Sequence, residues 1–194
     1  MNDLTELAAI YGTNKGFPRE GKTWHHYTGA YHSLLSPVRD KIEVVVEVGV
    51  HRGASLRMWR DYFPNAKVWG VDNGSGCPIE EIKAMAVSCS DVPLCEEIRV
   101  NLVFGEQANE EVLAKLPTRI DLVVDDGSHA PNDFLATLKV LFPRTNLMYI
   151  IEDVFPEFMK QTVKVVEEIS GGAWVMLRQK GTASLAVILF KGGA

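Results

Sequence analysis

Seven short apolar runs, most of them rich in β-branched residues, recur along the chain and constrain its fold more than any other feature. The runs are Ile42–Val48, Ala66–Val71, Ile98–Phe104, Ile120–Val124, Leu147–Ile151, Ala173–Leu177 and Leu185–Phe190. The first five are nearly continuous, as expected of strands that helices cover on both faces. Segments of helical composition and spacing lie between the runs, at Ser55–Tyr62, Glu80–Ala86, Asn109–Leu116, Asn132–Leu141 and Glu157–Ile169. This alternation predicts an α/β fold with a doubly wound, mostly parallel sheet.

The two ends of the chain depart from this rhythm. Only residues 178–184 separate the last two runs, which is too short for a crossover helix, so we expect an antiparallel hairpin there. The sheet then has seven strands. Before the first run, helices at Asp3–Tyr11 and Tyr31–Arg39 and a loop at Gly12–Trp24 predict a helical cap. We expect residues 1–194 to form one domain, with the cap at 1–41 and the α/β core at 42–194.

The composition argues against several classes of partner. The formal net charge is −5, and no basic run with interleaved aromatic residues is present, so we expect no nucleic acid partner. No apolar run approaches the ~20 residues that span a bilayer, and no signal peptide is recognisable, so we expect no membrane partner and a cytoplasmic location. Cys77, Cys89 and Cys95 form no metal-type pair and are expected to be free thiols, with a Cys89–Cys95 disulfide as the alternative.

A glycine-containing turn follows the first predicted strand and indicates a nucleotide-type ligand. The sequence from Glu47 to Ser55 is EVGVHRGAS, in which Gly49 and Gly53 allow a sharp turn before a helix N-terminus. Asp72 ends the second predicted strand 23 residues after Gly49, near the spacing of a ribose-binding acid. The turn reads GxxxG rather than the GxGxxG of dinucleotide folds, and Glu47 suits a ligand with an ammonium and a sulfonium. S-adenosylmethionine (SAM) is therefore favoured over NAD, and a purely structural turn is the third possibility.

Acidic side chains follow two later strands. Asp125 and Asp126 end the fourth predicted strand, and Glu152 and Asp153 end the fifth. The carboxyl ends of such strands face one crevice, where these carboxylates would repel each other unless a cation is bound. Oxygen-rich clusters suit Mg²⁺ or another divalent ion, and His129 beside the cluster is a candidate general base. The alternative is a turn at Asp126 with a solvated loop at Glu152 and Asp153.

Six segments occur in the order found in one enzyme family. They are YGTNK from Tyr11, HHYT from His25, EVGV from Glu47, GEQ from Gly105, VDDGSH from Val124 and IED from Ile151. The chain resembles the metal-dependent sugar O-methyltransferases of natural-product biosynthesis, which have a Rossmann-like class I methyltransferase fold. A looser similarity reaches the cephalosporin hydroxylase-like proteins.

The resemblance implies roles for individual residues. It implies that Asp126, Glu152 and Asp153 hold Mg²⁺ and that His129 is the catalytic base. On the cofactor side we expect a set of residues around SAM: Glu47, Gly49, Gly53, Ser55, Asp72, Gln107 and Asp125. We expect the cap to line the acceptor pocket through Lys15, His26 and Tyr27.

The resulting functional hypothesis is a SAM-dependent O-methyltransferase, assisted by Mg²⁺, that acts on a hydroxyl of a sugar or glycosylated natural product. Such a metal would orient the acceptor and lower its pKa. Two alternatives stay open: a non-catalytic partner subunit that binds SAM or metal, and an NAD-dependent sugar-modifying enzyme. The sequence leaves the identity of the acceptor and a homo-oligomeric state open.

Overall fold

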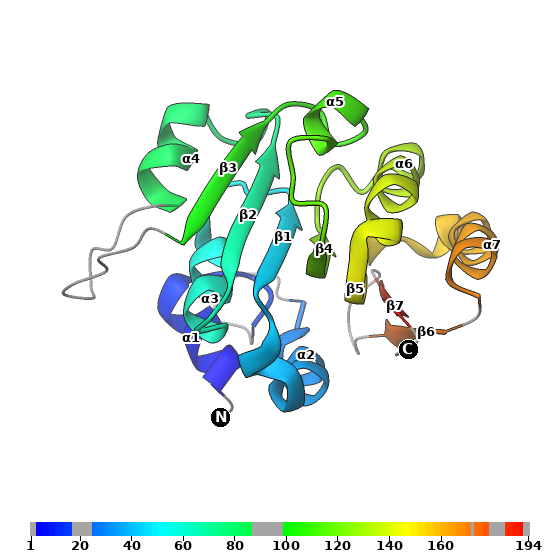
Figure 1. Cartoon of the computed structure of the whole chain (residues 1–194), viewed down its shortest axis with the longest axis horizontal. Coiled ribbons are helices and arrows are strands. Elements are labelled where there is room, and N and C mark those ends of the chain that lie inside the picture. Colours follow the sequence, from blue (N-terminus) through cyan, green and yellow to red (C-terminus); the bar gives the residue numbers. More distant parts are fainter. Residues whose placement is uncertain (1–2, 17–24, 87–98, 172, 179–184, 192–194) are drawn as a thin grey trace.

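The computed structural model describes residues 3–16, 25–86, 99–171, 173–178 and 185–191 (Figure 1). The helices are α1 (Asp3–Tyr11), α2 (Thr28–Leu35), α3 (Ala54–Tyr62), α4 (Ile79–Ala86), α5 (Glu110–Leu113), α6 (Pro131–Leu141) and α7 (Met159–Ser170). Short 3₁₀ segments are η1 (Ser36–Lys41), η2 (Phe142–Arg144) and η3 (Pro156–Phe158). The strands are β1 (Val44–Val48), β2 (Lys67–Asp72), β3 (Val100–Phe104), β4 (Ile120–Asp125), β5 (Thr145–Val154), β6 (Trp174–Arg178) and β7 (Leu185–Phe190).

The strands form one sheet with the order β3-β2-β1-β4-β5-β7-β6. The five strands from β3 to β5 are parallel to their neighbours, whereas β7 pairs antiparallel with both β5 and β6. The predicted doubly wound sheet and its C-terminal antiparallel strands are therefore confirmed. The strand order reverses between β1 and β4, and ligands in such sheets bind at this switch point.

Helices cover both faces of the sheet, and two hydrophobic cores result. Neighbouring strand residues point to opposite faces, so Val45 and Leu122 join the core under α1, α2, α3 and α4. Val46 and Val123 instead join the core under α5, α6 and α7. Burial on both faces explains why these strands are nearly continuous apolar runs. Figure 1 shows α6 and α7 on one side of the sheet, well separated from α1 and α2.

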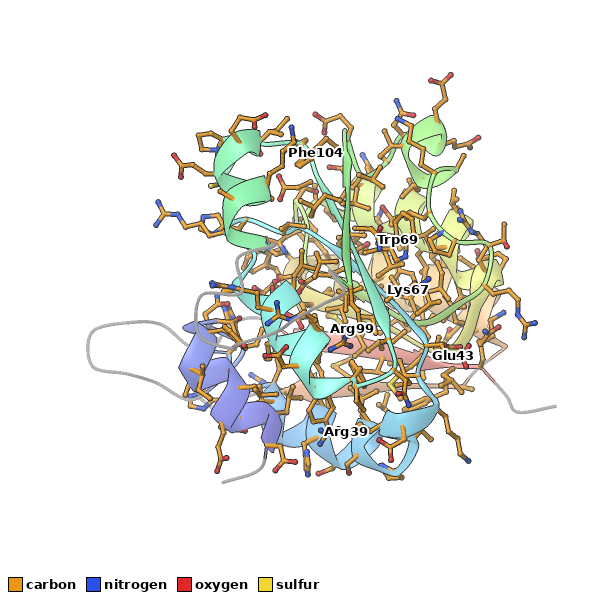
Figure 2. All side chains as sticks on the ribbon, turned by 60° about the vertical axis from the view of Figure 1, so that its left-hand side comes forward. Arg39, Glu43, Lys67, Trp69, Arg99 and Phe104 are labelled. Atoms are coloured by element: carbon orange, nitrogen blue, oxygen red, sulfur yellow. The ribbon has the colours of Figure 1, made fainter. Side chains whose placement is uncertain are left out.

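The cap helices pack on the first of these faces. Leu4 and Ala8 of α1 are fully buried in the core that contains Trp59 of α3. The hydroxyls of Thr5 and Thr28 lie 2.8 Å apart and join α1 to α2. At the far edge of the sheet, Arg99 donates to the carbonyl of Phe63 (2.9 Å) and holds the start of β3 against the turn before β2 (Figure 2).

Several predicted boundaries differ from the structure, and three of them have a clear physical reason. The second cap helix begins at Thr28 and gives way to a 3₁₀ turn at Ser36, because Pro37 follows directly and favours a new helical start. Helix α5 spans only Glu110–Leu113, after an N-cap at Asn109. Strand β5 continues to Val154, because β7 pairs with it that far.

The remaining expectations from the sequence concern membrane spans, the cysteines and two loops. Within the described residues, no helix is long and apolar enough to cross a membrane. Cys77 is free and buried. Cys89, Cys95, Ile98, the end of the cap loop at 17–24 and the hairpin loop at 179–184 lie outside the described residues.

The packing of α1 predicts that the cap contributes to the stability of the core. Leu4→Ala should lower the free energy of unfolding by about 2–5 kcal/mol, because it removes a fully buried side chain and leaves a cavity. Ile10→Ala on the same helix is the matched control, since Ile10 is 67% exposed and its truncation should cost less than about 0.5 kcal/mol. Urea unfolding followed by circular dichroism measures both. Equal effects would show that α1 does not pack as described.

Candidate active site

A cleft of about 560 Å³ opens at the carboxyl ends of β1, β2 and β4. The turn after β1, the ends of β2 and β3, and the loop after β4 form its walls. Its lining includes seven of the predicted site residues: Gly49, Ser55, Asp72, Gln107, Asp126, His129 and Asp153. Its volume is within the range of small-molecule sites. The sheet therefore places one sizeable cleft where its topology predicts a ligand.

Gly49 brings the two central turns into contact. Its φ is +86°, and a Cβ at this position would lie only 2.0 Å from the carbonyl oxygen of Asp126. The amide of Asp126 donates to the carbonyl of Val48 (2.8 Å), which holds the two chains together. Glycine is thus required here by the close approach of the loop after β4. This packing role was not anticipated from the sequence.

Asp72 organises the rim of the cleft at the end of β2. One of its oxygens, Oδ2, accepts hydrogen bonds from the amides of Val50 (2.8 Å) and His51 (2.9 Å). The other, Oδ1, accepts from the amide of Gly74 (2.7 Å). A carboxylate has about four acceptor positions, so Asp72 can hold both turns and still accept from a ligand hydroxyl.

Two carboxylates and an imidazole meet at the opposite side of the cleft. One ligand atom from each of Asp126, His129 and Asp153 lies within 4.8 Å of the others. His129 (φ 58°) and Asp153 (φ 54°) have left-handed backbone conformations, which are uncommon for residues other than glycine and cluster at functional sites. Nδ1 of His129 is buried and has no hydrogen-bond partner among the described residues. These groups form a candidate metal centre.

Behind this group lies a buried lysine. The side chain of Lys15 is 1% exposed, and its ammonium is 2.5 Å from Oδ2 of Asp126 and 2.6 Å from Oε2 of Glu152. Oε1 of Glu47 lies 3.5 Å away. Burial opposes the charged form, but the three carboxylates outweigh it and hold the pKa of Lys15 well above its usual value. The carboxylates around Lys15 therefore stabilise its charged form inside the protein.

Cap residues donate to the two acidic side chains of β5. The Tyr31 hydroxyl donates to Oε1 of Glu152 (2.9 Å), and the Tyr27 hydroxyl donates to Oδ1 of Asp153 (2.8 Å). Nδ1 of His25 lies 3.1 Å from the same Asp153 oxygen. Burial alone would raise the pKa of Asp153, but the contact with His25 and the hydrogen bond from Tyr27 lower it to about 2. The surroundings of Asp153 therefore favour its ionised form.

Two further acids lie beneath the cleft. Glu47 is fully buried and accepts from Ser55 (2.8 Å) and from the Trp59 ring nitrogen (3.2 Å). Burial raises the pKa of the Glu47 carboxyl to about 7. Asp125 accepts from Tyr149 (3.0 Å) and Gln107 (3.3 Å), and burial likewise raises its pKa to about 7.

The structure does not bring every predicted residue to the cleft surface. Those outside its lining are Glu47, Gly53, Asp125, Glu152, Lys15, His26 and Tyr27. The prediction that Lys15 and Tyr27 line an acceptor pocket does not match their positions, because both are buried and bonded to the acidic cluster. The alternative of a solvated loop at Glu152 is wrong, since Glu152 lies in β5 and is 2% exposed.

His25 and Tyr31 were missed as partners of the cluster. Their only sequence signal is the aromatic and histidine content of the cap, which does not say which side chains turn inward. The pairing of Tyr31 with Glu152 spans 121 positions and depends on the tertiary fold.

Comparison with known proteins supports the predicted resemblance. No family model matches the chain. The chain is 34% identical over 165 residues, 78% of its length, to the 8-demethyl-8-alpha-L-rhamnosyl tetracenomycin-C 2'-O-methyltransferase of Streptomyces olivaceus. It is 30% identical over 169 residues, 80% of its length, to the mycinamicin VI 2''-O-methyltransferase of Micromonospora griseorubida. The chain spans 37% of the length of each of these two relatives.

A solved structure shows the same fold. The MycE methyltransferase of the mycinamycin biosynthetic pathway, in complex with Mg and SAH, superposes with a TM-score of 0.70 at 22% identity. The match covers 98% of this chain and 55% of that one. The resemblance to sugar O-methyltransferases is thus confirmed, and the fold is that of the class I methyltransferases.

The contact at Gly49 generates a stability prediction. Gly49→Ala should destabilise the protein by about 3 kcal/mol or more, because backbone strain at positive φ adds to a clash with a peptide that cannot move alone. Gly12→Ala is the matched control: its φ is +73° but a Cβ there meets nothing within 4 Å, so only the ~1–2 kcal/mol of strain is expected. Thermal unfolding compares the two. Equal losses would refute the close contact.

Proposed function

We propose, from the likeness to sugar O-methyltransferases, that this chain transfers the methyl group of SAM to a hydroxyl of a sugar or glycosylated natural product, with the help of a divalent cation. The observation that carries the proposal is the arrangement of the cleft. Asp72 lies on one side, and Asp126, His129 and Asp153 lie on the other. A donor and an acceptor can therefore lie side by side, each next to suitable groups.

The side of the cleft near β1 and β2 fits SAM. The turn at Gly49 presents backbone close to the cleft, and Asp72 offers acceptor capacity for ribose hydroxyls. Gln107 also lines this region, and its Oε1 is already taken by the amide of Ser128 (2.7 Å). Glu47 lies beneath the cleft and accepts a hydrogen bond from Ser55, which holds the start of α3 in place. The MycE complex contains SAH on the same fold, which supports this placement.

The opposite side fits a divalent cation. Asp126 and Asp153 offer the carboxylate oxygens that Mg²⁺ prefers, and the unpartnered Nδ1 of His129 lies beside them. Glu152, the third acid of the predicted ligand set, lies directly behind them with its oxygens bonded to Lys15 and Tyr31. When bound, the cation would polarise an acceptor hydroxyl and lower its pKa.

The chain's own residues then orient the acceptor and move a proton. Asp126 and Asp153 hold the acceptor side of the cleft at a fixed distance from the SAM side. His129 takes the hydroxyl proton as the acceptor oxygen attacks the methyl carbon and the methyl–sulfur bond of SAM breaks, which releases S-adenosylhomocysteine. Orientation of two bound reactants can supply about 7–11 kcal/mol of barrier reduction.

The finer features of the function are part of the same proposal. The names of the two relatives give a rhamnosyl tetracenomycin and mycinamicin VI as the molecules that they methylate, which favours a sugar or glycosylated acceptor here as well. A single domain over 1–194 and a cytoplasmic location stay predictions. A non-catalytic partner subunit and an NAD-dependent enzyme are separated from the proposal by the assays below.

Binding of S-adenosylhomocysteine should depend on Asp72. At 100 times its Kd, this product should stabilise the fold by about 2.7 kcal/mol. Asp72→Asn should weaken binding by roughly 10- to 100-fold, because it removes the charge from an acceptor of ribose hydroxyls. Asp121→Asn is the control, since Asp121 also accepts from two backbone amides, those of Glu43 (2.8 Å) and Val44 (3.0 Å), at the other end of the strands. Calorimetry that shows tight NAD binding and no S-adenosylhomocysteine binding would overturn the cofactor assignment.

Methyl transfer should require both His129 and a divalent cation. His129→Ala should slow turnover by ~10²–10⁴-fold with little change in S-adenosylhomocysteine affinity, because it removes a general base. Higher pH should partly restore the rate. His32→Ala, which removes an imidazole bonded to Tyr62 outside the cleft lining, should leave turnover unchanged. A radiolabelled-methyl assay on a panel of glycosides, with EDTA and Mg²⁺ add-back, measures these effects. Full activity in EDTA would exclude the metal-assisted mechanism.

A further inference from the structure

Lys15 occupies a position that the proposed reaction does not use. Its ammonium lies among carboxylates that come from three different strands: Glu47 in β1, Asp126 after β4 and Glu152 in β5. The lysine itself comes from the segment between α1 and α2. One cap residue thus joins the SAM side of the sheet to the acidic cluster.

The burial of this group requires a physical reason. Desolvation of a lysine ammonium costs several kcal/mol, and the cost is offset only where carboxylates and hydrogen bonds surround it. Glu47 and Glu152 are themselves buried, and without a cation their charges would repel each other and Asp126. The ammonium has three donors, and three carboxylates face it. The single positive charge therefore offsets part of the repulsion among the three carboxylates and leaves the cluster acidic.

Hydrogen bonds fix the carboxylate oxygens that Lys15 does not take. Glu152 binds Lys15 through Oε2 and Tyr31 through Oε1, so both of its oxygens are held. Trp59 and Ser55 donate to the two oxygens of Glu47. The ring centroids of Tyr31 and Trp59 lie 6.2 Å apart, so the two donor side chains pack near each other. For Asp126, Lys15 takes Oδ2.

We propose that Lys15 is a positioning residue: a built-in cation that holds Asp126 and Glu152 in place before a metal ion binds and whose charge weakens the binding of that ion. This inference rests on the proposed function, because it assumes that a divalent cation binds beside Asp126. Lys15 thus preorganises the two carboxylates, and its positive charge lowers the affinity of the site for the metal ion.

Two opposite effects follow from removal of the Lys15 charge. The metal-free protein loses stability, because buried carboxylates lose their only lysine partner among the described residues. The metal affinity rises, because the same carboxylates then attract the divalent ion without competition from the ammonium. A lysine that only filled space would, when replaced, weaken folding and metal binding together.

The experiment compares Lys15→Met with the wild type and with Lys83→Met. Lys83 pairs with Glu80 at 2.8 Å on the surface and serves as the matched control. In EDTA we expect the Tm of Lys15→Met to fall by on the order of 10 °C. In calorimetric titration with MgCl₂ we expect its Kd to be roughly tenfold lower than that of the wild type. Mg²⁺ should therefore raise its Tm more than that of the wild type, and Lys83→Met should match the wild type throughout.

The outcomes distinguish a positioning role for Lys15 from a role in filling space. An unchanged Tm in EDTA, or a metal affinity that falls with stability, would overturn the role of Lys15. If Mg²⁺ binds neither the wild type nor the variant, the metal part of the proposed function fails and the inference fails with it. S-adenosylhomocysteine binding in the same samples shows separately whether the cofactor assignment stands.

A second variant covers the case in which Lys15→Met does not fold. The double variant Lys15→Met/Glu152→Gln removes one charge of each sign and keeps an acceptor for Tyr31. In EDTA it should fold and be more stable than Lys15→Met. A double variant no more stable than the single one would show that charge compensation is not the reason for Lys15, and would overturn the proposal.

Discussion

The turns after β1 and β4 lie against each other at Gly49 and Asp126, and the geometry of the cleft depends on this contact. Because no side chain separates the two turns, the amide of Asp126 can donate to the carbonyl of Val48 and extend the pairing of the strands beyond their ends. The Asp72 side and the acidic side of the cleft consequently share one backbone junction. A movement of either turn would change the distance between these two sides.

The N-terminal cap completes the site from behind. Lys15, Tyr27 and Tyr31 all reach the carboxylates from segments that precede the first strand. The cap therefore has an electrostatic function in addition to its packing on α3. An acidic cluster of this density is stable inside a protein only where cations and hydrogen-bond donors surround it, and here the donors come from a part of the chain distant in sequence.

The sequence predicted the sheet because burial on both faces leaves a clear pattern: the runs around Val45 and Val123 are nearly continuous stretches of apolar residues. It also predicted which acids cluster, since parallel strands end at one edge. It could not predict that Glu47 and Glu152 turn inward while Asp126 and Asp153 face the cleft. The strand was expected to end at Ile151, which would have left Glu152 in a loop, but pairing with β7 extends β5 to Val154 and fixes Glu152 within the strand. Lys15 was singled out as a residue of the acceptor pocket, but its burial against the acidic cluster was not predicted, because a lysine in a loop is ordinarily solvated.

Backbone strain around the cleft limits the number of destabilising mutations that the fold can tolerate. His51, His129 and Asp153 all line the cleft and all have positive φ, which costs of order 1–3 kcal/mol at each position. A domain of this kind is stable by only about 5–15 kcal/mol in total, so the site removes a large part of that margin. Mutations elsewhere in the core, harmless in an unstrained relative, would unfold this protein sooner. Directed evolution toward a new acceptor would therefore succeed more readily from a background first stabilised far from the cleft.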